Sequence, residues 1–202
     1  MDAEGWDRRY AGAELVWTAE PNRFLAAEAA DLPPGRALDL ACGEGRNAVW
    51  LAEREWDVTA VDFSQVGLEK GARLAEERGV TVRWERADLR EWAPPAAAFD
   101  LVVVLYLHVE AQARRAIHAA AARALAPGGV LLIVGHDATN IEHGHGGPQI
   151  PAILFEPDDL VEDVPGLDVE RAERVRRPVD TADGTAVAID ALLRARRPPA
   201  RG

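Results

Sequence analysis

The chain has 202 residues, 48% of them hydrophobic and 28% charged, which is typical of a globular protein with one ordinary domain. Its formal net charge of −11 argues against a nucleic-acid ligand, because such binding depends on lysine and arginine contacts to phosphate. It has one cysteine, Cys42, no apolar run near the roughly 20 residues that cross a bilayer, and no basic-then-apolar start. We therefore expect a cytoplasmic protein, a monomer or homodimer, that acts on a small molecule and binds no membrane.

The first two thirds of the chain alternate short apolar runs with longer segments of helical period. Strands are predicted over residues 37–41, 58–62, 80–85, 99–105 and 130–134. Helices are predicted over residues 46–54, 65–78 and 111–125. Because parallel strands need crossover helices, this order predicts an α/β protein with a doubly wound, mostly parallel sheet.

The remainder of the chain has a different pattern. Residues 135–157 are rich in glycine, proline and histidine without a clear period, which predicts a long loop. A short helix is predicted over 157–163. Two further β-like segments, 167–175 and 186–193, are predicted to form an antiparallel pair at the sheet edge, which makes seven strands in all.

The predicted elements divide the chain into three parts. Residues 1–32 contain an amphipathic segment and are predicted to form an N-terminal helical lid. Residues 33–196 hold every predicted strand and form the main domain. The basic, Pro-containing tail, 197–202, is predicted to be disordered.

A glycine-containing turn follows the first predicted strand, at the edge where doubly wound sheets bind ligands. Gly43 and Gly45 let the backbone turn sharply and approach a ligand, and the next helix begins there, which favours an anion. The run Gly43-x-Gly45-x-x-Ala48 also fits the loose dinucleotide pattern, with Asp62 about 20 residues further on as a ribose-binding acid. The glycines alone leave NAD and S-adenosylmethionine as alternatives.

Four ordered motifs resemble those of class I S-adenosylmethionine-dependent methyltransferases. They are Asp39-x-x-Cys42-Gly43-x-Gly45-Arg46-Asn47, Val61-Asp62-Phe63-Ser64, Ala87-Asp88-Leu89 and Leu125-Ala126-Pro127-Gly128-Gly129. With Trp6-Asp7-Arg8-Arg9-Tyr10 near the start, the chain looks closest to small bacterial methyltransferases related to tellurite-resistance proteins. The resemblance covers nearly the whole chain and implies a Rossmann-like methyltransferase fold in which residues 33–196 bind S-adenosylmethionine.

The resemblance also implies a role for each matching residue. Asp62 would accept hydrogen bonds from the ribose hydroxyls and Asp88 from the adenine amino group, while Asp39 would order the turn and help hold the methionine ammonium group. Helix caps or turn acids are the alternative for Asp62 and Asp88, and anchoring of a helix to the core is the alternative for Tyr10 and Trp17. The implied cofactor-binding set is Tyr10, Trp17, Asp39, Cys42, Gly43, Gly45, Asn47, Asp62, Phe63, Ser64, Asp88, Leu89 and Leu105.

Methyl transfer is an in-line displacement at a sulfonium carbon, so the protein mainly positions the reactants and takes a proton when needed. The acceptor should meet the end of the fourth strand, the loop after the fifth and the N-terminal lid. The catalytic candidates in those places are Tyr106, His108, His136, His143 and His145. A structural cap is the alternative for His108, and solvated loop histidines are the alternative for His136, His143 and His145.

Two features of these regions bear on the type of reaction. The Asn-Pro-Pro-Tyr or Asp-Pro-Pro-Tyr motif of nucleic-acid and amide N-methyltransferases is missing where Leu105 and Tyr106 stand. His143-Gly144-His145 beside Glu142 could ligate zinc or iron. Its glycine-rich surroundings favour a mobile lid and methyl transfer needs no metal, so no metal is predicted.

The sequence therefore predicts a methyltransferase that moves a methyl group to sulfur, selenium or tellurium, oxygen or nitrogen of a small molecule. An NAD-dependent oxidoreductase is one alternative, but the only lysine, Lys70, is not part of a Tyr-x-x-x-Lys pair. A module that retains the cofactor without catalysis is the other alternative, and the loop histidines count against it.

Overall fold

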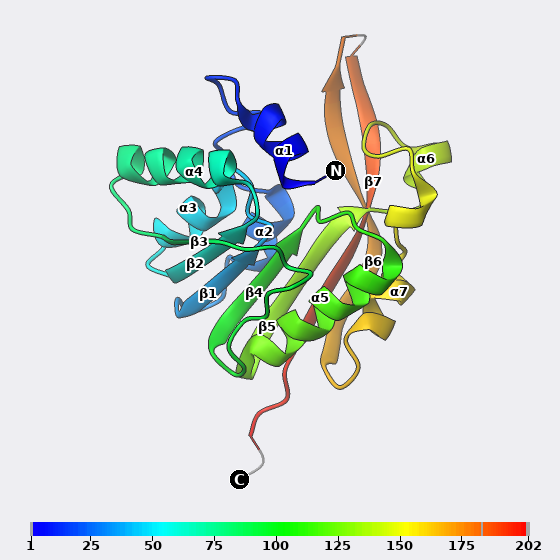
Figure 1. Ribbon diagram of the computed structural model, residues 1–202. Coiled ribbons are helices and arrows are strands. Elements are labelled where there is room, and N and C mark those ends of the chain that lie inside the picture. The colour runs from blue at the N-terminus through cyan, green and yellow to red at the C-terminus, as the bar shows by residue number, and fades with distance from the viewer. Residues whose placement is uncertain (1, 183, 201–202) are drawn as a thin grey trace.

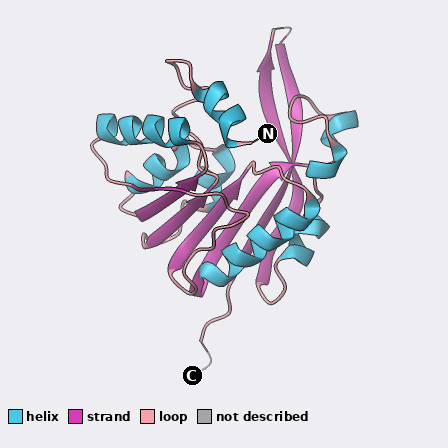
Figure 2. Ribbon diagram, viewed as in Figure 1, coloured by secondary structure: helices cyan, strands magenta, loops and turns pink. Residues whose placement is uncertain are grey.

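The computed structural model describes residues 2–182 and 184–200. One seven-stranded sheet runs through the molecule, with helices packed on both faces (Figures 1 and 2). The strands are β1 (Arg36–Leu40), β2 (Asp57–Asp62), β3 (Arg83–Arg86), β4 (Phe99–Leu105), β5 (Leu125–His136), β6 (Asp168–Thr181) and β7 (Gly184–Arg196). The helices are α1 (Ala3–Tyr10), α2 (Arg23–Glu28), α3 (Arg46–Ala52), α4 (Gln65–Arg78), α5 (Ala111–Ala124), α6 (Asn140–His143) and α7 (Pro157–Asp163).

The strand order is β3-β2-β1-β4-β5-β7-β6. β1 to β5 are parallel, and β7 is antiparallel to both β5 and β6. This arrangement confirms the predicted doubly wound sheet with an antiparallel pair at its end. The order reverses between β1 and β4, and ligands of such sheets bind at the carboxyl ends of the strands beside that point.

Side chains that alternate along the strands build a separate core on each face of the sheet. Leu101 and Val103 of β4 pack with α2, α3 and α4 in one core. Val102 and Val104 pack with α5 and α7 in the other. All four residues are at most 1% exposed, so β4 is buried on both faces, as its continuous apolar run predicts.

A buried ion network joins α5 to α7 on the second face. The carboxylate of Asp163 accepts hydrogen bonds from Arg114 Nε at 2.7 Å, and lies 2.9 Å from His118 Nδ1. All three side chains are at most 4% exposed. A paired charge of this kind fixes how the two helices dock.

Several boundaries differ from the predicted ones. The third strand begins at Arg83, because Val80 donates its N–H to Ala75 and so closes the end of α4. The predicted loop 135–157 contains α6 and a 3₁₀ turn, Pro151–Ile153. Its first two residues, 135 and 136, belong to β5. Their order comes from pairing with β7, in which His136 lies opposite Asp190.

The β6–β7 hairpin is longer than predicted and projects beyond the carboxyl edge of the sheet (Figure 1). At its other end, Arg197 exchanges two backbone hydrogen bonds of 2.9 Å with Gly128 and Gly129, so the start of the predicted tail is ordered. Residues 201 and 202 of that tail lie outside the described residues.

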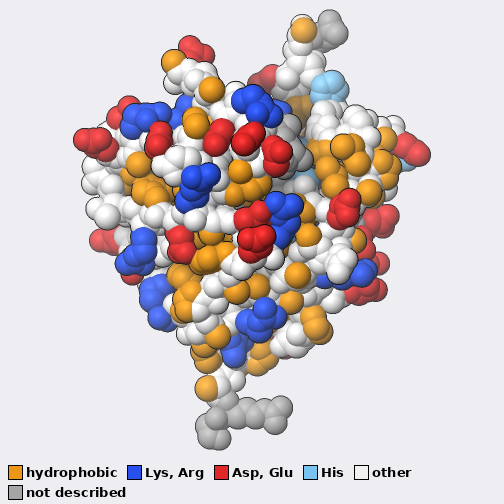
Figure 3. Space-filling view, in the orientation of Figure 1, with side chains coloured by type: hydrophobic (Ala, Val, Ile, Leu, Met, Phe, Trp, Pro, Cys, Tyr) orange, Lys and Arg blue, Asp and Glu red, His pale blue; other side chains and the backbone are white. Residues whose placement is uncertain are grey.

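Acidic and basic side chains are interspersed over the face seen in Figure 3. In the part of the chain that the structure describes, none of the helices has the length and apolar character needed to cross a membrane.

Candidate functional site

The glycine turn after β1 is folded tightly at the carboxyl edge of the sheet. Ala41, Gly43 and Gly45 have φ values of +58°, +56° and +77°, in the left-handed region that glycine adopts most readily. The N–H of Gly43 donates to Asp62 Oδ2 at 2.8 Å, which ties the turn to the end of β2. A Cβ on Gly45 would come within 2.4 Å of the Trp84 ring, so packing against β3 also requires glycine there.

Asp62 ends β2 and is 6% exposed. Its two carboxylate oxygens accept backbone hydrogen bonds from Gly43 and Ser64, each at 2.8 Å, and each oxygen keeps a further lone pair. Burial raises the pKa of this carboxyl. The side chain of Ser64 caps α4, since its hydroxyl donates to Asp7 and accepts from the N–H of Gly67. Phe63, between the two, is half-buried.

Asp39 lies inside β1 and is 1% exposed. Its Oδ2 has no hydrogen-bond partner among the described residues. Burial, reinforced by neighbouring Asp62, raises the pKa of Asp39 to about 8. A buried polar atom without a partner is costly, so this oxygen suits a cation or an N–H donor bound beside it.

The N-terminal segment packs over the turn. Tyr10, at the end of α1, is 4% exposed, and its hydroxyl lies so close to Gly43 that a Cβ there would come within 2.9 Å of it. Trp17 is 39% exposed, and its backbone N–H donates to Glu44 Oε2 at 3.1 Å. Lys70 Nζ donates to the same Glu44 carboxylate at 2.9 Å. The turn therefore has its own buried ion pair, which holds the segment in place.

Three other residues of the implied cofactor set are engaged by the protein itself. Asn47 Oδ1 accepts the N–H of Asn22 at 2.8 Å and so holds the segment before α2. Cys42 is buried, and burial raises the pKa of its thiol. Leu105 ends β4 and packs in the core beneath the turn. These contacts help to hold the glycine turn on the carboxyl edge of the sheet.

Asp88 and Leu89 follow β3 on the far side of the turn. The Asp88 carboxylate is 29% exposed and binds the Arg90 side chain through Nη2 at 2.5 Å and Nε at 2.9 Å. These hydrogen bonds lower the pKa of Asp88. Leu89 packs against the core under α5. Contact with an adenine amino group would require Asp88 to share its carboxylate with Arg90.

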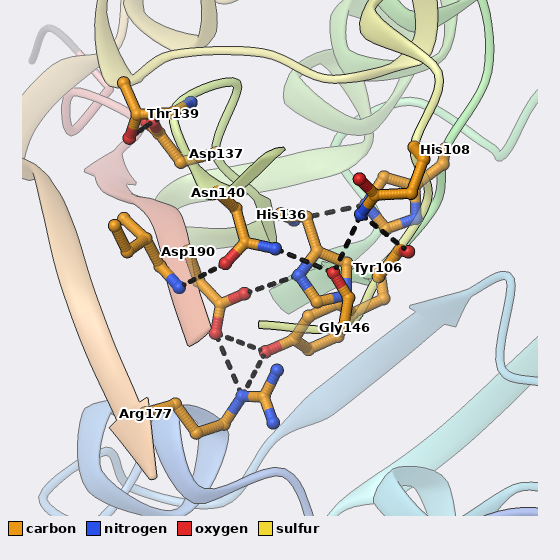
Figure 4. A network of polar contacts seen from close by, with 12 residues as sticks. Tyr106, His108, His136, Asp137, Thr139, Asn140, Gly146, Arg177 and Asp190 are labelled. Atoms are coloured by element: carbon orange, nitrogen blue, oxygen red, sulfur yellow. Dashed lines mark hydrogen bonds and ion pairs between the residues drawn. The ribbon is translucent and has the colours of Figure 1, made fainter. Parts of the chain in front are cut away.

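A second polar group, which we call the Tyr106 cluster, lies at the carboxyl ends of β4 and β5 (Figure 4). It consists of Tyr106, His108, His136, Arg177 and Asp190. Tyr106 follows β4 with a φ of +58°, which is rare for a bulky residue and is found most often at functional sites.

The fully buried carboxylate of Asp190, in β7, is the centre of this cluster. The Tyr106 hydroxyl donates to Asp190 Oδ2 at 2.8 Å, and Arg177 Nε donates to the same oxygen at 3.0 Å. Arg177 Nε also lies 3.1 Å from the Tyr106 hydroxyl. Burial opposes ionisation of Asp190, but contacts with His136, Arg177 and Tyr106 outweigh it and lower the pKa. Asp190 is therefore a carboxylate at neutral pH.

The two imidazoles of the cluster have different environments. His108 Nε2 accepts the backbone N–H of His136 at 3.1 Å, and burial lowers the pKa of His108 to about 4. His108 is therefore neutral, with its acceptor nitrogen already occupied. His136 Nδ1 lies 3.1 Å from Asp190 Oδ1, off the line of a hydrogen bond, and its ring stacks on His108 with centroids 5.3 Å apart. His136 is the imidazole in direct contact with the buried carboxylate.

The loop after β5 is pinned over His136. Asn140 is 1% exposed, accepts the N–H of Ile189 at 2.7 Å and donates to the carbonyl of Gly146 at 2.9 Å. The next residue, Gly147, lies so close to His136 that a Cβ would come within 2.8 Å of the ring.

His143 and His145 are not brought to the Tyr106 cluster. Both are exposed on this loop, His143 with 68% of its side chain accessible, and the nearest charged partner of His143 is Glu142 at 3.8 Å. Within residues 2–182 and 184–200, no three His, Cys, Asp or Glu side chains are arranged to hold a metal ion.

The chain was compared with known proteins. Residues 37–129 match a family model described as a methyltransferase domain. A trans-aconitate 2-methyltransferase of Sinorhizobium fredii is 35% identical over 148 residues, which are 70% of this chain and 48% of the relative. The chain thus spans about half the length of that curated relative.

Solved structures share the fold. The N-methyltransferase NodS of Bradyrhizobium japonicum, solved with S-adenosylhomocysteine, has a TM-score of 0.71 at 21% identity. The alignment covers 97% of this chain and 98% of the NodS chain. TehB of Haemophilus influenzae has a TM-score of 0.73 at 18% identity, and the alignment covers 96% of this chain and 66% of the TehB chain. Residues 37–129 thus match a methyltransferase domain, and the chain has the fold of class I S-adenosylmethionine-dependent methyltransferases.

S-adenosylmethionine is the cofactor of methyltransferases with this fold, and the residues at the carboxyl edge of the sheet fit it. The unpartnered Asp39 oxygen suits the methionine ammonium group. Asp62 keeps lone pairs for ribose hydroxyls at the end of β2.

The sequence analysis does not include three residues of this candidate site, Glu44, Arg177 and Asp190. Asp190 carries a usable signal, because a lone acid in the apolar run 186–193 is unusual in a buried strand. Glu44 stands between the two glycines, where no general rule marks it. Arg177 is one of several arginines in β6, and only the fold distinguishes it from the others.

Proposed function

We propose that this protein transfers the methyl group of S-adenosylmethionine to a small molecule held against the Tyr106 cluster. One observation supports this most directly. The cofactor turn and the Tyr106 cluster follow neighbouring strands, since Leu40 of β1 pairs with Val104 of β4 and Val104 pairs with Ile133 of β5. A methyl donor over β1 and an acceptor over β5 would therefore meet near Tyr106.

The cofactor supplies an activated methyl group on a sulfonium, which needs little further activation. The chain then has to orient the acceptor and remove its proton. Tyr106, Asp190 and Arg177 form a rigid wall because each is hydrogen-bonded to the other two. His136 is the proton acceptor in this proposal: its Nδ1 lies 3.1 Å from Asp190 Oδ1, and the nearby carboxylate would stabilise the imidazolium formed when Nε2 takes the acceptor's proton.

This assignment favours His136 over the other histidines. His108 has its acceptor nitrogen occupied by a backbone N–H. His143 and His145 are exposed outside the cluster. The relatives support a small acceptor, since trans-aconitate, named for the Sinorhizobium fredii protein, is a small molecule.

The test is a methyl-transfer screen with the full chain across thiols, selenium and tellurium oxyanions, phenols and amines, with released S-adenosylhomocysteine as the readout. We expect turnover of at least one class, which also identifies the acceptor atom. His136→Gln should lower kcat by about 10²–10⁴-fold, the usual contribution of a general base. The double variant His143→Ala, His145→Ala is the control and should keep near wild-type turnover. Binding of NAD in place of S-adenosylhomocysteine, or full activity of His136→Gln, would contradict the proposal.

A further inference from the structure

Arg177 uses one edge of its guanidinium group inside the Tyr106 cluster and leaves the other free. Its Nε binds Asp190 and Tyr106, while neither terminal nitrogen makes a hydrogen bond to the described residues. In Figure 4 these two nitrogens point away from Asp190. The side chain is 23% exposed, so the free edge reaches open space at the carboxyl ends of the strands.

A second arginine, Arg46, lies close by at the start of α3. Its Nη1 is 3.4 Å from the Thr18 hydroxyl. Burial lowers the pKa of Arg46, Tyr106 and Asp39 raise it, and Arg177 lowers it. Arg46 and Arg177 are thus close enough for each positive charge to oppose the other.

The charged side chains at this edge are mostly paired within the protein. Asp190 balances Arg177, and Glu44 balances Lys70. Asp39, with a pKa of about 8, is mostly protonated at neutral pH before the cofactor binds. Arg46 has Asp39 and Glu44 as its acidic neighbours. Bound S-adenosylmethionine would add a net positive charge to this edge, because it carries a sulfonium, an ammonium and one carboxylate.

We propose that the methyl acceptor carries a carboxylate and that the free edge of Arg177 binds it. Two parallel N–H groups of a guanidinium match the two oxygens of a carboxylate, and the rest of Arg177 is already fixed by Asp190 and Tyr106. The carboxylate anchors the acceptor, and the methylated atom is a second group that faces the sulfonium. This inference rests on the proposed function and adds the class of substrate to it.

The position of Arg177 assigns it to the acceptor and not to the cofactor. It comes from β6, at the opposite end of the sheet from β2 and β3, and its partners are Asp190 of β7 and Tyr106 after β4. The residues that fit the cofactor come from β1 and β2.

The test is calorimetric binding to the full chain saturated with S-adenosylhomocysteine. The probes are three pairs of nearly equal shape, in which an amide NH2 replaces one oxygen of the carboxylate: acetate and acetamide, benzoate and benzamide, and 3,4-dihydroxybenzoate and its amide. We expect the carboxylate to bind more tightly in these pairs, by about tenfold or more, as a charge-assisted pair of hydrogen bonds provides. The inference is overturned if no carboxylate binds more tightly than its amide, or if sulfate and phosphate bind as well as benzoate.

Variants then locate the binding group. Arg177→Met should abolish the preference for the carboxylate, and Arg177→Lys should keep part of it. Arg176→Met removes the same charge from an exposed neighbour in β6 and should change nothing. If Arg177→Met does not fold because Asp190 is left unpaired, the Arg177→Lys variant and the wild-type probe pairs still test whether Arg177 binds a carboxylate.

Binding of S-adenosylhomocysteine separates the two proposals. We expect Arg177→Met to bind it with wild-type affinity. A loss of that affinity would place Arg177 at the cofactor and overturn the inference alone. Failure of the wild-type chain to bind S-adenosylhomocysteine would instead overturn the proposed function.

Discussion

A carboxylic acid buried without a partner holds its proton more tightly than one in water, and Asp39 is in this position, with a pKa of about 8. An ammonium group bound beside it would favour the carboxylate and lower that pKa. The cofactor complex then holds fewer protons than the free protein at neutral pH. Cofactor affinity should therefore rise with pH and level off above the pKa of the free protein.

We predict that the affinity for S-adenosylhomocysteine increases between about pH 6 and pH 8, with a slope approaching tenfold per pH unit, because one pKa unit corresponds to about 1.4 kcal/mol. Titration calorimetry in buffers of different ionisation enthalpy should show the release of up to one proton. The affinity of the Asp39→Asn variant should not depend on pH in this range. Asp57→Asn, at the exposed start of β2, should keep it. A wild-type affinity that does not change with pH would rule out this role of Asp39.

At the scale of elements, the N-terminal segment is fastened to the glycine turn by the carboxylate of Glu44. Glu44 accepts the N–H groups of Val16 and Trp17, both at 3.1 Å, and the ammonium of Lys70 at 2.9 Å. Both charged side chains of the pair are at most 5% exposed. Removing one partner would leave the other charge buried and unpaired.

We expect Glu44→Ala to lower the free energy of unfolding by about 3–5 kcal/mol, the usual cost of breaking a buried ion pair. The segment 11–20 should also become sensitive to limited proteolysis. The matched control is Glu4→Ala, which breaks the exposed pair with Arg8 and should change stability by less than about 1 kcal/mol. Urea unfolding measures both, and a Glu44→Ala chain as stable and protease-resistant as wild type would refute the fastening role.

At the scale of the whole molecule, one sheet divides two cores. Since β4 contributes to both, loss of either core would expose the other, and the chain should unfold in one transition. S-adenosylhomocysteine at 100 times its dissociation constant should add about 2.7 kcal/mol of stability, which raises Tm by roughly 5–11 °C for a chain of this size. Scanning calorimetry checks both, with NAD as the ligand control. Two separate transitions would show that the cores unfold independently, and an unshifted Tm would show that the ligand does not bind the folded chain.

The fold could be predicted from the sequence because its signals are local: the buried strand Phe99–Leu105 contains the apolar run Leu101–Leu105, and α4 ends at Gly79. The cofactor turn is local too, since Gly43 and Asp62 are 19 residues apart. The Tyr106 cluster is not. Tyr106 meets Arg177 and Asp190 across 71 and 84 residues, and no pattern within a strand or loop records such a contact. For the same reason His143 and His136 look equivalent in the sequence, whereas only His136 continues β5 to lie opposite Asp190.

The end of β4 also divides the two groups of site residues along the sequence. Every residue that we assign to the methyl donor stands at or before Leu105, whereas Tyr106, His136, Arg177 and Asp190 all follow it. The residues assigned to the donor thus precede those of the Tyr106 cluster in the chain. We therefore expect exchange of residues 106–196 between related proteins to change the choice of acceptor while leaving the affinity for S-adenosylhomocysteine nearly unaltered.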